Sequence, residues 1–376
     1  MTRRPLARFM HIVLDRFLLL PIGAAIALVW ANTAPESYFV FARRAAFIVN
    51  EIGMAFFFAL IAQEVVEAVM PGGALHSWRR WALPVVAAVG GMIGAVAVYL
   101  GYVHLQYEDV LSPAWPIACA IDAAATYYVL RTILPHGGAL PFALLLAIIT
   151  DIIGLFFVAP RHLVTSVRAG GVALITIALV LAATLRALKV RAFWPYVLIC
   201  GALSWVAFYW EGLHPAFALI PIVPFLRHEP RHINVFADPP DNDAVHHVEH
   251  EWHLLVQGII FAFGLVNAGV MLRGYDTGSW AMLSAELAGR PLGILAAVAL
   301  ATGAGLHMPR HVGWREMVVI ACATSSGFAI ALFFATGLLA TGPVLAEAKI
   351  GVLMSAAGAG IAFGVAWLLK VGRLAH

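Results

Sequence analysis

Long apolar stretches, each close to the length of a bilayer crossing, follow one another along nearly the whole sequence. The hydrocarbon core of a membrane is about 30 Å thick, so a helix that spans it needs roughly 20 mostly apolar residues. The stretches that meet this requirement have approximate limits of 12–32, 45–70, 81–103, 113–134, 138–159, 169–188, 193–210, 213–226, 247–272, 279–304, 315–340 and 346–370. The sequence therefore predicts an all-α, polytopic membrane protein with about twelve transmembrane helices, in which residues 1–376 form a single transmembrane domain.

The amino-acid composition excludes most other classes of protein. Hydrophobic side chains make up 62% of the chain and charged ones only 11%, whereas a soluble domain is roughly 45–50% apolar and about 25% charged. The net charge is +3 and no run of Lys and Arg occurs, so no nucleic-acid partner is expected. Because the sequence has neither a nucleophile–base arrangement nor a nucleotide-binding loop, we expect no enzyme and no cofactor.

The Lys and Arg residues indicate how the spans are oriented. If both termini are inside, most of these residues fall in cytoplasmic segments, as the positive-inside rule predicts. We therefore expect a multi-pass protein, surrounded by membrane lipid, with cytoplasmic N- and C-termini. The segment 32–44, between the first two spans, is expected to be a loop.

Four ionisable residues inside the predicted spans are the strongest functional candidates: Glu64, Asp122, Asp151 and Arg290. A charge in mid-bilayer costs at least ~2.5–3.5 kcal/mol, so such residues are functional candidates by default. A buried carboxylate can exchange a proton for a small cation, because both neutralise the same charge. Arg290 would balance the acids while the site is empty. Two alternatives stay open: Asp122 and Arg290 form a structural ion pair, and Glu64 is a wetted residue at the end of its span.

Two of the predicted spans contain residues that favour a broken helix. The fourth opens with Pro113 and Pro116, and the eleventh contains the polar and flexible run 324–327. Such breaks are tolerated where the freed backbone groups line a polar cavity, and paired breaks in two halves of a transporter indicate its binding site. The third-to-fifth and tenth-to-twelfth spans would enter the membrane from opposite sides, which predicts an inverted repeat. The alternative is that these Ser and Thr hydroxyls simply bond back to their own helix.

A histidine-rich segment lies at the start of the ninth span. On a helix, His246, His250 and His253 would share one face, with Glu249 beside them. Histidine titrates near neutral pH, so the segment is interpreted as a sensor of cytoplasmic pH. A metal site and a solvated helix start are the alternatives.

Several stretches resemble the NhaA family of bacterial sodium/proton antiporters over nearly the whole chain. The matching stretches are 54–60, 83–93, 147–151, 261–270 and 289–294. The resemblance implies two broken, crossing helices and antiport of Na⁺ against H⁺ across the bacterial inner membrane. It also implies that Glu64 lines a cytoplasmic funnel, and that Glu249, His250 and His253 belong to a pH-responsive segment.

The chain departs from the family pattern at several site positions. The family carries two adjacent aspartates in the fifth span, where this chain has Thr150 and Asp151, and its tenth-span lysine is Arg290 here. Alignment on residues 146–149 makes Asp151 the second of the two acids, whereas alignment on Gly154 makes it the first. The resemblance implies two protons per sodium, but a single acid at 150–151 predicts an exchange closer to one-for-one and less driven by voltage.

The predicted function is therefore secondary antiport of Na⁺, with Li⁺ or K⁺ as alternatives, against H⁺. Asp151, with Asp122 and Thr150, would bind the transported ion or proton, and Asp122 would balance charges at helix ends. Two rivals remain: a carrier of the same fold with a changed substrate or stoichiometry, and a non-transporting membrane pH sensor. The segment 32–44 is short for the family's periplasmic dimer hairpin, so the sequence does not decide whether the protein forms a homodimer.

Overall fold

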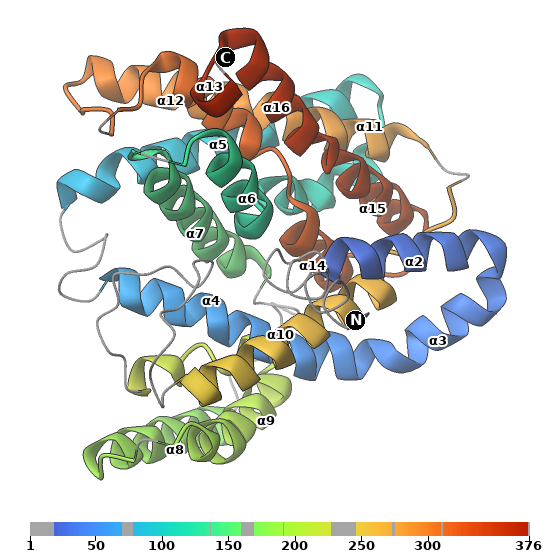
Figure 1. Cartoon of the computed structure of the whole chain (residues 1–376). Coiled ribbons are helices and arrows are strands. Elements are labelled where there is room, and N and C mark those ends of the chain that lie inside the picture. The colour runs from blue at the N-terminus through green and yellow to red at the C-terminus, as the bar shows by residue number, and fades with distance from the viewer. Residues whose placement is uncertain are drawn as a thin grey trace, which may run out of the picture. The chain divides into compact units, whose positions relative to one another are not determined.

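A computed structural model describes residues 19–69, 78–135, 137–158, 169–190, 192–226, 246–272, 275–309 and 311–374. All regular elements in these residues are helical, and the chain divides into two compact units. Unit 1 comprises Met1–His76 and Ala159–Gly269, and unit 2 comprises Ser77–Val158 and Val270–His376. Figure 1 shows the order of the helices. The predicted all-α class is confirmed.

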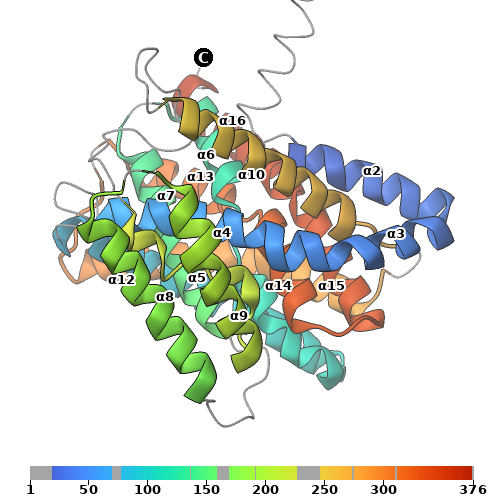
Figure 2. The same ribbon diagram turned by 90° about the horizontal axis from the view of Figure 1, so that it is seen from below.

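Unit 1 contains the N-terminal helices and the helices of the middle of the chain. These are α2 (Leu19–Thr33), α3 (Pro35–Phe47), the π-helical turn η1 (Ile48–Gly53), α4 (Met54–Val69), α8 (Ala169–Ala187), η4 (Tyr196–Gly201), α9 (Ala202–Glu211), η5 (Pro215–Phe217), η6 (Val223–Phe225) and α10 (His246–Asn267). Helices α2 and α10 pack along each other, as do α8 and α9. The two helices of each pair lie side by side in both views (Figures 1 and 2).

Unit 2 contains two series of helices, each with a broken element in second place. The first series is α5 (Trp78–Leu105), η3 (Asp109–Cys119) with α6 (Ala123–Ile133), and α7 (Ala139–Val158). The second is α11 (Thr277–Ser284), η7 (Ala285–Gly289) and α12 (Arg290–Gly303), then α13 (Trp314–Ala323) with α14 (Phe328–Leu338), then α15 (Pro343–Ser355) and α16 (Ala357–Leu369), with η8 (Gly372–Leu374) at the end. This order agrees with the expected pair of repeats, while their inverted orientation stays a prediction.

Glycines allow α5 and α12 to approach closely. A Cβ atom added to Gly293 would lie 2.2 Å from the carbonyl oxygen of Gly90, and one added to Gly90 would lie 2.7 Å from the carbonyl oxygen of Gly293. Small residues at helix interfaces are the usual means of close backbone approach in membrane proteins. The pair brings Arg290, at the start of α12, into a tightly packed part of unit 2.

The number of spans is only partly established by the structure. Among the described residues, 5 helices are long and apolar enough to cross a membrane, or up to 6 if the bent pair α13 and α14 is one span. Four shorter apolar helices are Leu19–Thr33, Ala139–Gly154, Tyr196–Glu211 and Leu255–Asn267. These findings support a multi-pass membrane protein, and the count of about twelve stays a prediction.

Two local predictions are wrong. The predicted eighth span, 213–226, contains only the short 3-10 turns η5 and η6, because Pro215, Pro221 and Pro224 remove the amides that a continuous helix needs. The predicted loop 32–44 is largely the helix α3, which continues through η1 into α4. Pro35 at its first turn, followed by Glu36, is a favourable helix start.

Candidate ion-binding site

Two broken helices cross each other within unit 2. The backbone amide of Asp122, in the break between η3 and α6, donates to the carbonyl oxygen of Ser326, in the break between α13 and α14, at 2.8 Å. The hydroxyl of Thr126 donates to the carbonyl oxygen of Ala323 at 3.3 Å. The axes of α13 and α14 are bent by 44° at their break. The predicted breaks in the fourth and eleventh spans are therefore confirmed, and they meet each other.

Asp122 lies at the N-terminal ends of both broken helices. Its Oδ1 atom accepts a hydrogen bond from the amide of Ala125, in the first turn of α6, at 3.0 Å. Its Oδ2 atom accepts one from the amide of Ala329, in the first turn of α14, at 3.3 Å. A helix N-terminus carries about +0.5 charge, so one carboxylate faces the partial positive charges of two helices. This is the geometry that charge balance by Asp122 requires.

Arg290 lies at the opposite, C-terminal ends of the same two crossing elements. Its Nη1 atom donates to the carbonyl oxygen of Thr324, at the end of α13, at 2.8 Å, and its Nη2 atom donates to that of Ala118, at the end of η3, at 2.6 Å. The side chain is only 1% exposed. The described contacts of Asp122 and Arg290 go to backbone groups. These contacts do not support a direct ion pair between the two side chains.

Asp151 and Thr150 lie together on α7, and both are buried. The Thr150 hydroxyl donates to the carbonyl oxygen of Leu146 on its own helix at 2.8 Å, which leaves its oxygen lone pairs for another partner. The Asp151 carboxylate acts electrostatically on Arg290. The structure therefore brings Asp151 into the electrostatic environment of the crossing, and its role as ion ligand stays a prediction.

One buried acid at the crossing, Glu286, is not among the residues predicted from the sequence. It lies on the π-helical turn η7, four residues before Arg290, and is fully buried. Its Oε1 atom would be 2.9 Å from a Cβ atom added to Gly327, in the break between α13 and α14. The available signal was an acid one turn before Arg290 inside the apolar stretch 279–304.

The other sequence candidates lie in unit 1. Glu64 is on α4, and Glu249, His250 and His253 are near the start of α10, but their side chains lie outside the described residues. Their predicted roles in the funnel and in pH response therefore stay predictions. In the part of the chain that the structure describes, no group of three or more His, Cys, Asp or Glu side chains could hold a metal ion.

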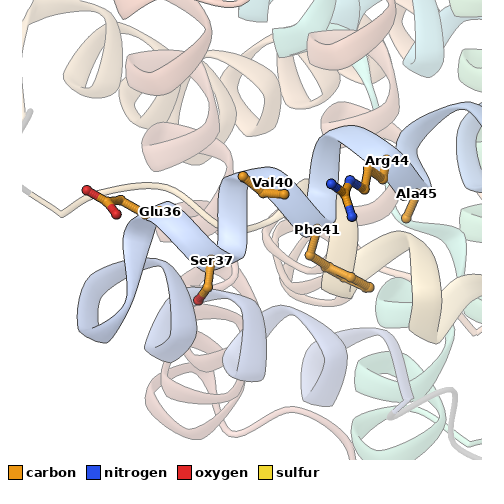
Figure 3. A pocket seen from close by; sticks show the side chains of 6 residues that line it. All are labelled: Glu36, Ser37, Val40, Phe41, Arg44 and Ala45. Atoms are coloured by element: carbon orange, nitrogen blue, oxygen red, sulfur yellow. The ribbon is translucent and has the colours of Figure 1, made fainter.

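The surface pocket in Figure 3 lies on α3 in unit 1. It is lined by Glu36, Ser37, Val40, Phe41, Arg44 and Ala45 of α3. None of the ion-binding candidates lines it.

Crossed, interrupted helices whose ends are balanced by buried charges are typical of secondary transporters, which bind ions where helices are discontinuous. The sequence profile described as Na⁺/H⁺ antiporter 1 matches residues 8–368, and the chain belongs to this family. It is a family of transporters rather than of enzymes.

Curated relatives match nearly the whole chain. The chain is 37% identical over 370 residues to the Na⁺/H⁺ antiporter NhaA of Desulfitobacterium hafniense, covering 94% of each protein. It is 34% identical over 368 residues to the Na⁺/H⁺ antiporter NhaA of Geobacter metallireducens, covering 94% of this chain and 95% of the relative. The predicted membership of the NhaA family is confirmed.

A solved structure supports the fold. The sodium proton antiporter MjNhaP1 from Methanocaldococcus jannaschii, at pH 8, superposes with a TM-score of 0.53 at 15% sequence identity. The match covers 94% of this chain and 90% of the other. At this identity, the likeness extends to the fold alone.

Proposed function

We propose that this protein exchanges Na⁺ for H⁺ across the bacterial inner membrane, with both termini in the cytoplasm. The observation that carries the proposal is the crossing of two broken helices in unit 2, with Asp122 at their positive ends and Arg290 at their negative ends. The Na⁺/H⁺ antiporters among the relatives support the choice of ions.

The exchange depends on competition for one buried negative charge. Asp151 binds either Na⁺ or a proton, because leaving the carboxylate bare in a low-dielectric site is unfavourable. Thr150 adds a neutral oxygen ligand beside it. Asp122 and Arg290 keep the helix ends compensated when the site is empty, so that the ion can leave without exposing an uncompensated helix charge.

Access to the site alternates between the two sides of the membrane by movement of one helix bundle relative to the other. Glu64 lines the cytoplasmic approach to the site. Glu249, His250 and His253 tune the rate to cytoplasmic pH, since histidine changes charge near neutrality.

The test is exchange by the purified protein in proteoliposomes loaded with a pH-sensitive dye. Acidified vesicles that contain wild-type protein are expected to lose their proton gradient when Na⁺ is added, and vesicles with Asp151→Asn are expected to keep it. Li⁺ and K⁺ added in turn determine the selectivity. A response to a different cation alone would indicate a carrier with a changed substrate. No response to any of the three ions at pH 6–9 would favour the pH sensor and contradict the proposal.

A further inference from the structure

We propose that Glu286 is a second exchangeable carboxylate of the ion site, which takes up a proton or shares a bound alkali-metal cation in the same cycle as Asp151. This inference rests on the proposed Na⁺/H⁺ exchange. It adds to the site an acid from a different helix, and it replaces the one-for-one exchange that a single acid at 150–151 predicts.

Glu286 lies at the break of the second crossing helix. The π-helical turn η7 carries it between α11 and α12, and π-helical turns occur often at functional sites. Its carboxylate reaches the break between α13 and α14, since its Oε1 atom faces the backbone of Gly327. The Ser355 hydroxyl is another polar neighbour of this carboxylate. Glu286 is therefore at the helix crossing itself, where the breaks expose backbone groups.

Glu286 is also fully buried, and no hydrogen bond of standard geometry holds its carboxylate. Its exposed fraction is 0%, and neither carboxylate oxygen has a hydrogen-bond partner of standard geometry. Arg290 lies within electrostatic range, but its two terminal nitrogens donate to backbone carbonyls and its Nε atom is also unbonded. A buried carboxylate that is not held by hydrogen bonds requires a proton or a cation.

The charge balance of the crossing also favours a second exchangeable acid. Two helix N-termini, each with about +0.5 charge, offset Asp122, and two C-termini, each with about −0.5 charge, offset Arg290. Asp151 and Glu286 are two further buried acids of unit 2, and Arg290 is the cationic neighbour of both. Two protons neutralise this pair, and a Na⁺ that displaces both protons leaves one negative charge on the site. The exchange therefore moves two protons per Na⁺ and carries net charge.

Ser355 completes the local chemistry of the protonated state. Its hydroxyl donates to the carbonyl oxygen of Val352 at 2.8 Å. The Ser355 hydroxyl and the Gly327 amide are polar neighbours of the Glu286 carboxylate. Because its hydrogen is directed at Val352, the Ser355 oxygen keeps lone pairs that can accept a hydrogen bond from a protonated Glu286, and the Gly327 amide can donate to an ionised one. Both protonation states have a neighbour that suits them, as an exchangeable group requires.

The pH difference at which net exchange stops, for a given Na⁺ gradient, measures the number of protons exchanged per Na⁺. In proteoliposomes clamped at zero membrane potential, a tenfold Na⁺ gradient is balanced by a pH difference of about one unit for one proton per Na⁺, and about half a unit for two. Wild-type protein and Glu286→Asp are expected to balance at about half a unit, and Glu286→Gln at about one unit. The matched control is Glu316→Gln, the same change at the exposed start of α13, which is expected to behave as wild type.

A Glu286→Gln variant that balances at the wild-type pH difference would overturn the inference. If this variant folds but does not transport, protons released per Na⁺ bound are counted in detergent. One proton fewer than wild type supports the inference, and an equal number overturns it. Failure of wild-type protein to exchange Na⁺ for H⁺ at all is a separate result, which contradicts the proposed function itself.

Discussion

Replacing Asp122 by Asn tests whether one carboxylate holds the ends of two helices. The carboxylate accepts bonds from Ala125 at 3.0 Å and from Ala329 at 3.3 Å. The Asn side chain has one acceptor and one donor, so one amide keeps a weaker, neutral bond and the other faces an NH₂ group. A hydrogen bond to a charged group contributes about 1.5–3 kcal/mol and a neutral one about 0.5–1.5 kcal/mol. Together the two changes are expected to destabilise the protein by about 2–4 kcal/mol.

Thermal unfolding of the purified protein in detergent measures this loss. For a chain of this length, the expected shift is a fall in Tm of about 3–5 °C. The control is Asp276→Asn, at the exposed start of α11, where the carboxylate caps a single helix through the amide of Thr277. Because Asn is as good an N-cap as Asp, this control is expected to change stability by less than about 0.5 kcal/mol. Equal, small effects of the two substitutions would refute the double capping by Asp122.

Two further predictions concern packing and pH. Gly293→Ala places a methyl group 2.2 Å from the carbonyl oxygen of Gly90, so thermal unfolding is expected to show a loss of about 1–3 kcal/mol. Gly303→Ala, where an added Cβ meets nothing within 4 Å, is its control, and an equal loss there would contradict the packing argument. Because protons compete with Na⁺ for the site, each unit of acidification is expected to raise the Na⁺ concentration for half-maximal flux by up to about tenfold per proton released. A half-maximal concentration that does not change between pH 6 and 9 would contradict this competition.

The broken helices were predictable because their causes are local. Pro113 and Pro116 remove backbone donors from the fourth span, and Ser, Thr and Gly weaken the eleventh at residues 324–327. Prolines also explain why the prediction of a span at 213–226 is wrong. The average hydropathy of this segment fits a span, but its prolines prevent a continuous helix. Hydropathy measures how apolar a segment is, and it does not test whether each backbone amide can be satisfied.

The details of the site could not be predicted, because they depend on contacts between distant parts of the sequence. Asp122 and Ala329 are 207 residues apart, and Arg290 and Ala118 are 172 apart. Glu286 was missed for the same reason, since its position at the crossing depends on Gly327 and Ser355 as well as on its own helix. Sequence identifies acids in apolar stretches, whereas packing determines which helix end each acid meets.

The central claim is that Na⁺ and protons compete for the buried carboxylate of Asp151. Isothermal titration of Na⁺ into purified protein, repeated in buffers with different heats of ionisation, counts the protons released on binding. Wild-type protein is expected to release protons as Na⁺ binds, and Asp151→Asn is expected to lose both the binding and the release. Binding of Na⁺ to wild-type protein without proton release, or unchanged release in Asp151→Asn, would contradict the claim.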